Sequence, residues 1–124
     1  MKNVVTSKAP AAIGPYSQGI DIGNLVFTSG QLPLNMETGE METEIKAATK
    51  ASLSNVKAIL AEAGLTMDNV IKTTVFIITM NNFAAMNEVY ATFFGETAPA
   101  RSCVEVARLP KDVLVEIEAV AVRK

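Results

Sequence analysis

The segment Val70–Thr79, which reads Val-Ile-Lys-Thr-Thr-Val-Phe-Ile-Ile-Thr, is rich in β-branched residues. Such residues pack well on the pleated surface of a sheet and are disfavoured in helices. We therefore expect a strand here, in the centre of a sheet.

Amphipathic helices are expected on both sides of this segment in the sequence. Residues 42–63 repeat apolar side chains along one stripe, with Glu44 in the first turn and Gly64 as the stop. The second helix is expected over residues 83–94, with Asn82 as its N-cap.

Further strands are expected near both ends of the chain. Residues 18–22 and 25–29 predict a hairpin, and room remains for one more strand before them. A short connection joins residues 101–106 to 113–122, which favours an antiparallel pair. The order of elements predicts a single α+β domain over residues 1–124, a sandwich of one mixed sheet with both helices on one face.

The last strand predicts one buried face and one face that is half apolar and half acidic. Such a face, left open, favours association with another subunit. If the last two strands pair around Leu109-Pro110, Arg101 lies opposite Glu118 and Cys103 lies opposite Glu116, on one side of the sheet. This cluster is either a reactive patch or a structural ion pair beside a buried cysteine.

The composition excludes several classes of chemistry. The chain has no histidine and one cysteine, so a Ser-His-Asp triad, a His-ligated metal, a Cys-x-x-Cys motif and an internal disulfide are all excluded. A net charge of −2 argues against nucleic acid as a partner. No run of apolar residues is long enough to predict a membrane span or a signal peptide, so a cytoplasmic location is expected.

Three motifs carry a resemblance to a known family. They are Ile-Gly-Pro-Tyr-Ser-Gln at 13–18, Thr-Ser-Gly-Gln at 28–31 and Pro-Ala-Arg-Ser-Cys-Val-Glu-Val-Ala-Arg-Leu-Pro at 99–110. Together with the tail Val-Glu-Ile-Glu-Ala-Val-Ala-Val, they resemble the Rid family, also called YjgF, in order and over essentially the whole chain. The resemblance points to the branch of reactive-intermediate enamine/imine deaminases.

That resemblance implies a chorismate-mutase-like fold, a homotrimer with ligand clefts between subunits, and no metal or organic cofactor. It implies the hydrolysis of 2-iminopropanoate, derived from 2-aminoacrylate, and of 2-iminobutanoate to 2-oxo acids and ammonia. These imines are released by pyridoxal-phosphate-dependent dehydratases, which would be functional partners.

The resemblance also implies roles for particular residues. Arg101 matches the anchor of the substrate carboxylate, Glu116 matches the residue that positions or activates water, and Cys103 matches a pocket cysteine. Further pocket positions that match the family are Tyr16, Ser29, Gly30 and Asn87. The segment 95–98 is shorter than in several members of the family, which leaves the preferred size of substrate open.

The residue types suit this chemistry. The arginine fork binds a carboxylate through two parallel hydrogen bonds, and a carboxylate can orient water and take its proton. Cys103 is disfavoured as a nucleophile because no histidine can activate it. The alternatives are a non-catalytic protein that senses small carboxylates and, less favoured by the acidic balance, a ribonuclease or translation inhibitor.

Overall fold

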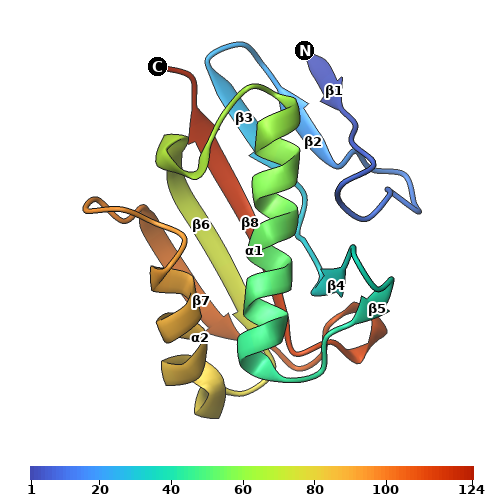
Figure 1. Ribbon diagram of the computed structural model, residues 1–124, viewed down its shortest axis with the longest axis vertical. Helices are drawn as coiled ribbons and strands as arrows, with labels where there is room; N and C mark the ends of the chain where they lie inside the picture. The colour runs from blue at the N-terminus through green and yellow to red at the C-terminus, as the bar shows by residue number, and fades with distance from the viewer.

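A computed structural model describes residues 1–124 (Figure 1). Its helices are α1 (Ile45–Glu62) and α2 (Phe83–Ala91), with single 3₁₀ turns at Met67–Asn69, Met80–Asn82 and Pro110–Asp112. Its strands are β1 (Lys2–Val4), β2 (Gly19–Asp21), β3 (Leu25–Thr28), β4 (Leu34–Asn35), β5 (Glu40–Met41), β6 (Val70–Ile77), β7 (Ala100–Glu105) and β8 (Val115–Val122).

One six-stranded mixed sheet forms the body of the molecule, in the order β1-β2-β3-β8-β6-β7. The β6–β7 pair is parallel and every other pair is antiparallel. Both helices cover the same face of the sheet (Figure 1), and the buried core lies between them and the sheet. The predicted α+β architecture is confirmed, and Val70–Ile77 is an internal strand as its composition predicts.

Helix α1 begins three residues later than expected. Glu44 is its N-cap, where the side-chain carboxylate accepts a hydrogen bond from the backbone N–H of Lys46, rather than a residue of the first turn. The helix ends before Gly64, whose φ of 81° allows the left-handed turn that stops it. Asn55 on α1 donates to the carbonyls of Leu32 and Leu34 and so holds the preceding connector against the helix.

Helix α2 ends three residues earlier than expected, and its predicted cap is wrong. Asn82 makes no capping hydrogen bond with its side chain. Instead, the hydroxyl of Thr79 accepts from the backbone N–H of Asn81 and caps the 3₁₀ turn that leads into α2. The physical reason is that this turn already supplies partners for the first N–H groups.

The predicted pairing of the last two strands is wrong. Strand β6 lies between β7 and β8, and the segment from Val106 to Leu114 passes across the end of β6 instead of forming a hairpin. Helix α2 is the crossover that brings β7 beside β6 in parallel, as a β-α-β connection requires. A short connection was therefore insufficient to predict that the strands it joins are neighbours.

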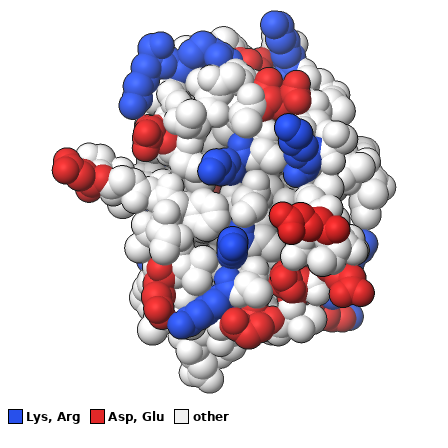
Figure 2. All heavy atoms as spheres, in the orientation of Figure 1, with Lys and Arg blue, Asp and Glu red and all other residues white.

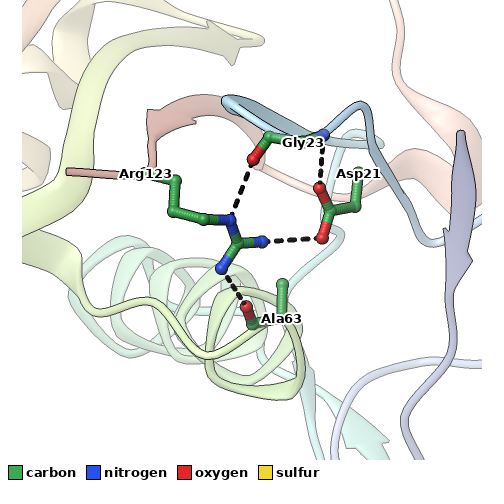
Figure 3. A network of polar contacts seen from close by, with 4 residues as sticks. All are labelled: Asp21, Gly23, Ala63 and Arg123. Atoms are coloured by element: carbon green, nitrogen blue, oxygen red, sulfur yellow. Dashed lines mark hydrogen bonds and ion pairs between the residues drawn. The ribbon is translucent and has the colours of Figure 1, made fainter.

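Arg123 joins three elements at the end of β8 (Figure 3). Its guanidinium donates to the carbonyl of Gly23 in the β2–β3 turn at 2.9 Å, to the carbonyl of Ala63 after α1 at 3.0 Å, and to the carboxylate of Asp21 at 2.7 Å. The Asp21 carboxylate also accepts a hydrogen bond from the backbone N–H of Gly23 at 2.8 Å. This bond is the main reason that the pKa of Asp21 is lowered, and the charge of Arg123 lowers it further. The arginine thus satisfies a carbonyl that the end of α1 leaves without a helical partner.

The two faces of the sheet differ in what covers them: both helices lie on one face and none lies on the other (Figure 1). On the helix-bearing face, basic and acidic side chains are interspersed among uncharged atoms (Figure 2). The opposite face of the sheet is not covered by any helix and exposes Phe27 and Val104 by 41% and 43%. We call it the open face; its side chains include Ile20, Phe27, Thr74, Phe76, Ser102, Val104, Glu116, Glu118 and Val120. Neither helix is long and apolar enough to cross a bilayer.

Candidate active site

Arg101 lies on strand β7 and points toward helix α2. Its guanidinium donates a hydrogen bond to the side-chain oxygen of Asn87 at 2.7 Å. Cys103, two residues further along β7, lies on the same face of the strand. The structure therefore brings together three of the predicted site residues, which we call the guanidinium half-site: Asn87, Arg101 and Cys103.

Two aromatic rings of α2 complete the surroundings of Arg101. The guanidinium carbon lies 4.8 Å from the centre of the Tyr90 ring and 5.5 Å from that of Phe83. The hydroxyl of Tyr90 is hydrogen-bonded to that of Thr73 on β6 at 2.6 Å, in a buried position. Phe83 and Tyr90 are not among the residues that the sequence predicts for the site, although they share with Asn87 the i, i+4, i+7 spacing of a single helix face.

No carboxylate of the chain neutralises Arg101. Arg108 pairs with Asp112 at 2.6 Å and Arg123 pairs with Asp21 at 2.7 Å, whereas the hydrogen-bond partner of Arg101 is a neutral amide. The side chain is also only partly buried. The charge of Arg101 is therefore not balanced by a carboxylate of the chain, and N–H groups remain free for an external anion.

The Cys103 thiol does not have the properties of a nucleophile. Burial raises its pKa above the ordinary value, and the nearby charge of Arg101 offsets only part of that effect. Since the thiolate is the reactive form, Cys103 is mostly protonated at neutral pH. Its place beside Arg101 is consistent with a residue that shapes a pocket.

Glu116 lies on strand β8 against Gly30. The backbones of Gln31 and Ile117 exchange two hydrogen bonds, at 2.8 and 3.2 Å, and this bridge places Gly30 beside Glu116. A Cβ atom on residue 30 would overlap the Glu116 carboxylate. Glycine is thus required here for close approach and not for a special backbone angle.

The Glu116 carboxyl has a raised pKa. Burial is the larger cause, and the negative charge of Glu118 on the same face of the strand adds to it. A carboxylate with a raised pKa is a better proton acceptor than an exposed one, so long as it remains ionised at the working pH.

The other predicted residues gather on the same side as Glu116. Tyr16, half exposed, lines a cavity of about 170 Å³ together with Gly30 and Lys111. The Ser29 hydroxyl donates to the carbonyl of Ser17 at 2.5 Å, which ties this wall to the loop that carries Tyr16. We call this group the carboxylate half-site: Tyr16, Ser29, Gly30 and Glu116.

The two half-sites lie on opposite faces of the sheet. Arg101 is paired with Thr73 on β6, and Glu116 is paired with Phe76, three residues further along. An odd separation places side chains on opposite faces of a strand. The expectation that Arg101, Cys103 and Glu116 converge within one chain is therefore wrong, because β6 intervenes between the strands that carry them.

The side chains of this chain do not form a metal-binding cluster. Nowhere do three or more His, Cys, Asp or Glu residues come together in a way that could hold an ion. What the half-sites offer is one cation with free N–H donors and one carboxyl with a raised pKa, which suit the binding of an anion and the activation of water.

The chain is similar to known proteins over nearly its whole length. Residues 6–123 match the family model described as Endoribonuclease L-PSP. A relative from Escherichia coli (strain K12), named 2-iminobutanoate/2-iminopropanoate deaminase, is 56% identical over 126 residues, which covers 99% of this chain and 98% of the relative. A RutC family protein from Haemophilus influenzae is 61% identical over 123 residues, with coverage of 96% and 95%.

The fold comparison gives the same result. The crystal structure of E. coli TdcF with bound serine has a TM-score of 0.96 and 55% sequence identity, and the match covers 100% of both chains. The chain therefore belongs to the Endoribonuclease L-PSP family, which is the Rid (YjgF) family that its motifs resemble.

Proposed function

We propose that this protein hydrolyses 2-imino acids, such as 2-iminopropanoate and 2-iminobutanoate, to 2-oxo acids and ammonia. The observation that carries the proposal is the unpaired guanidinium of Arg101, which is held by Asn87 and open to a carboxylate. Relatives that are 56% identical, with coverage of 99% of this chain and 98% of the relative, are named 2-iminobutanoate/2-iminopropanoate deaminase. Every 2-imino acid has a carboxylate next to its electrophilic carbon, so one arginine can both bind and orient it.

The chemical steps need only a bound water and a proton acceptor. The water oxygen attacks the carbon of the C=N bond, whose electron pair moves to nitrogen. Glu116 takes the proton that the water loses and returns it to the nitrogen, which gives a carbinolamine. The hydroxyl proton of this intermediate then passes, again through Glu116, to the amino nitrogen. The C–N bond breaks, its electron pair leaves with ammonia, and the electron pair on oxygen forms the carbonyl. Tyr16, Ser29 and Gly30 would line the side of the substrate that faces Glu116.

The active site would be assembled between subunits of a homotrimer. Arg101 and Glu116 cannot reach the same small molecule within one chain, because they lie on opposite faces of the sheet. The open face supplies apolar surface for association, with Phe27 and Val104 among its exposed residues. The guanidinium half-site of one subunit would then meet the carboxylate half-site of the next.

The source of the substrate follows from its instability. Imines and enamines such as 2-aminoacrylate hydrolyse readily and cannot be stored, so the protein would act near the pyridoxal-phosphate-dependent dehydratases that release them. We place this reaction in the cytoplasm and assign no cofactor to it.

A coupled assay tests the proposal directly. The purified protein is added to a threonine or serine dehydratase, and formation of the 2-oxo acid is followed. We expect acceleration over spontaneous hydrolysis, and a loss of at least about 100-fold in kcat/KM for Arg101→Ala, since a charge-assisted bidentate contact is removed. Arg101→Lys should recover little, because lysine keeps the charge but not the fork.

Absence of acceleration would refute the enzymatic proposal. Calorimetric binding of 2-oxobutanoate by a protein that does not accelerate hydrolysis would instead identify a carboxylate sensor. The same unpaired Arg101 supports that second candidate, since anion binding requires no turnover.

A further inference from the structure

Helix α2 presents one of its faces to Arg101. Phe83, Asn87 and Tyr90 lie at i, i+4 and i+7, and each of them contacts the guanidinium. Asn87 accepts from one terminal nitrogen at 2.7 Å, while the two rings lie over the guanidinium carbon at 5.5 and 4.8 Å. Stacking on the rings uses none of the guanidinium N–H groups, so the N–H groups that Asn87 does not bind stay available to a ligand.

The Tyr90 ring is itself held in place. Its hydroxyl is hydrogen-bonded to Thr73 on the central strand β6 at 2.6 Å, and its ring packs against Phe94 with 4.8 Å between centres. Tyr90 is 7% exposed and Thr73 is 1% exposed. Thr73 is also the residue that pairs with Arg101 across the β6–β7 ladder. Thr73 therefore holds the Arg101 backbone through strand pairing and the Tyr90 ring through the hydroxyl hydrogen bond.

We propose that Tyr90, locked by Thr73, is a positioning residue that holds Arg101 in its substrate-binding orientation, with Phe83 as a second support. This inference rests on the proposed role of Arg101 as the anchor of the substrate carboxylate. An arginine side chain loses considerable rotational freedom when it binds an anion. A guanidinium already stacked on a fixed ring has lost part of that freedom before substrate arrives, so binding costs less.

The roles of ring and hydroxyl can be separated by substitution. Tyr90→Leu removes the ring, and Tyr90→Phe keeps the ring while it removes the hydrogen bond to Thr73. We expect Tyr90→Leu to lower kcat/KM by about 3- to 30-fold, mainly through KM, as the loss of a cation–π contact predicts. Tyr90→Phe should stay within about threefold of the unsubstituted protein, which would show that the ring carries most of the effect. Phe93→Leu is a matched control on the same segment, and its kcat/KM should not change.

A merely structural role is excluded by a double-mutant cycle. If Tyr90 acts through Arg101, Tyr90→Leu should have no further effect on kcat/KM in the Arg101→Ala background. An equal loss in both backgrounds, or an unchanged kcat/KM in a folded Tyr90→Leu variant, would overturn the proposal.

A spectroscopic measurement keeps this test independent of the reaction. In the nuclear magnetic resonance spectrum, the Nε–H proton of Arg101 should be shifted by the ring beneath it, and the shift should be lost in Tyr90→Leu but kept in Phe93→Leu. An Nε–H resonance that is the same in all three proteins would overturn the stacked geometry. If the unsubstituted protein fails to accelerate imine hydrolysis, the deaminase proposal fails alone, and the same cycle is measured on the Kd for 2-oxobutanoate. Equal weakening of that binding by Tyr90→Leu in both backgrounds would again contradict the positioning role.

Discussion

At the scale of single residues, Gly30 determines where the Glu116 carboxylate lies. The two residues come together because Gln31 and Ile117 exchange backbone hydrogen bonds. The space that a side chain on residue 30 would fill is occupied by the carboxylate. A small change at position 30 should therefore affect chemistry more than stability.

Gly30→Ala should displace the Glu116 carboxylate while the fold remains intact, because the group that must move is the flexible end of a side chain. We expect kcat in the coupled assay to fall by about 10- to 100-fold, as expected when a general base is misplaced. Circular dichroism should be unchanged. In the Glu116→Gln background the same substitution should cost nothing more, and a further loss there would mean that Gly30 acts in another way.

The pH at which activity declines on the acid side should be set in part by Glu118. A general base works only when ionised, and both burial and Glu118 raise the pKa of Glu116 above the ordinary 4.5. Activity should therefore decline on the acid side from a higher pH than an exposed glutamate would give. Glu118→Gln removes one of the causes, so the acid limb of the profile of kcat/KM against pH should move to lower pH.

The control for this prediction is Glu62→Gln, because Glu62 lies at the end of α1, away from both half-sites. Its acid limb should coincide with that of the unsubstituted protein. An acid limb that Glu118→Gln leaves in place would show that Glu116 is not the group that controls it.

At the scale of elements, one buried amide fastens the N-terminal segment to the sheet. Gln18, 4% exposed, accepts from the backbone N–H of Thr6 at 2.8 Å. Its amide nitrogen donates to the carbonyls of Thr6, Ala9 and Pro10 at 3.0, 3.3 and 2.8 Å. These bonds hold the segment that leads to Tyr16, so a wall of the carboxylate half-site depends on them.

Gln18→Ala should lower the free energy of unfolding by about 2–4 kcal/mol, since it leaves several buried backbone groups without partners. Urea unfolding at a fixed protein concentration measures this change, because association contributes to the apparent stability. We also expect a higher KM, as the wall that carries Tyr16 loosens. A change below about 0.5 kcal/mol would mean that water replaces the amide without cost.

At the scale of the whole molecule, the half-sites lie on opposite faces, so we expect trimers that mix two different inactivating variants to recover activity. Arg101→Ala and Glu116→Gln should each retain no more than about 1% of the activity as a pure protein. When the two are refolded together in equal amounts, some contacts between subunits join an intact Arg101 to an intact Glu116. Random assembly should place such a pair at about a quarter of the contacts, so about a quarter of the activity should return.

The same assembly should be visible by mass. Light scattering should give three times the 13.2 kDa of one chain, and Phe27→Asp on the open face should reduce the mass and the activity together. Mixtures that remain inactive although they assemble would show that the site does not lie between subunits.

The local pattern of the sequence predicted most of the secondary structure. The strand at Val70–Ile77, the hairpin around Gly23 and the two helices were all expected, because β-branched runs, turn residues and apolar stripes act over a few neighbouring positions. The helix ends were less accurate, since Thr79 and Glu44 compete with other residues to cap the same N–H groups. The neighbours of β7 and β8 were not predictable from a short connection alone.

The available chemistry could be deduced from the residue types alone: no histidine, one cysteine, and the family motifs that single out Arg101 and Glu116. The arrangement of these groups in space depends on the fold. The insertion of β6 between β7 and β8 sends Arg101 to the face that bears α2 and Glu116 to the open face. The physical reason is that side-chain direction alternates along a strand, so it depends on the register of neighbours that are distant in sequence.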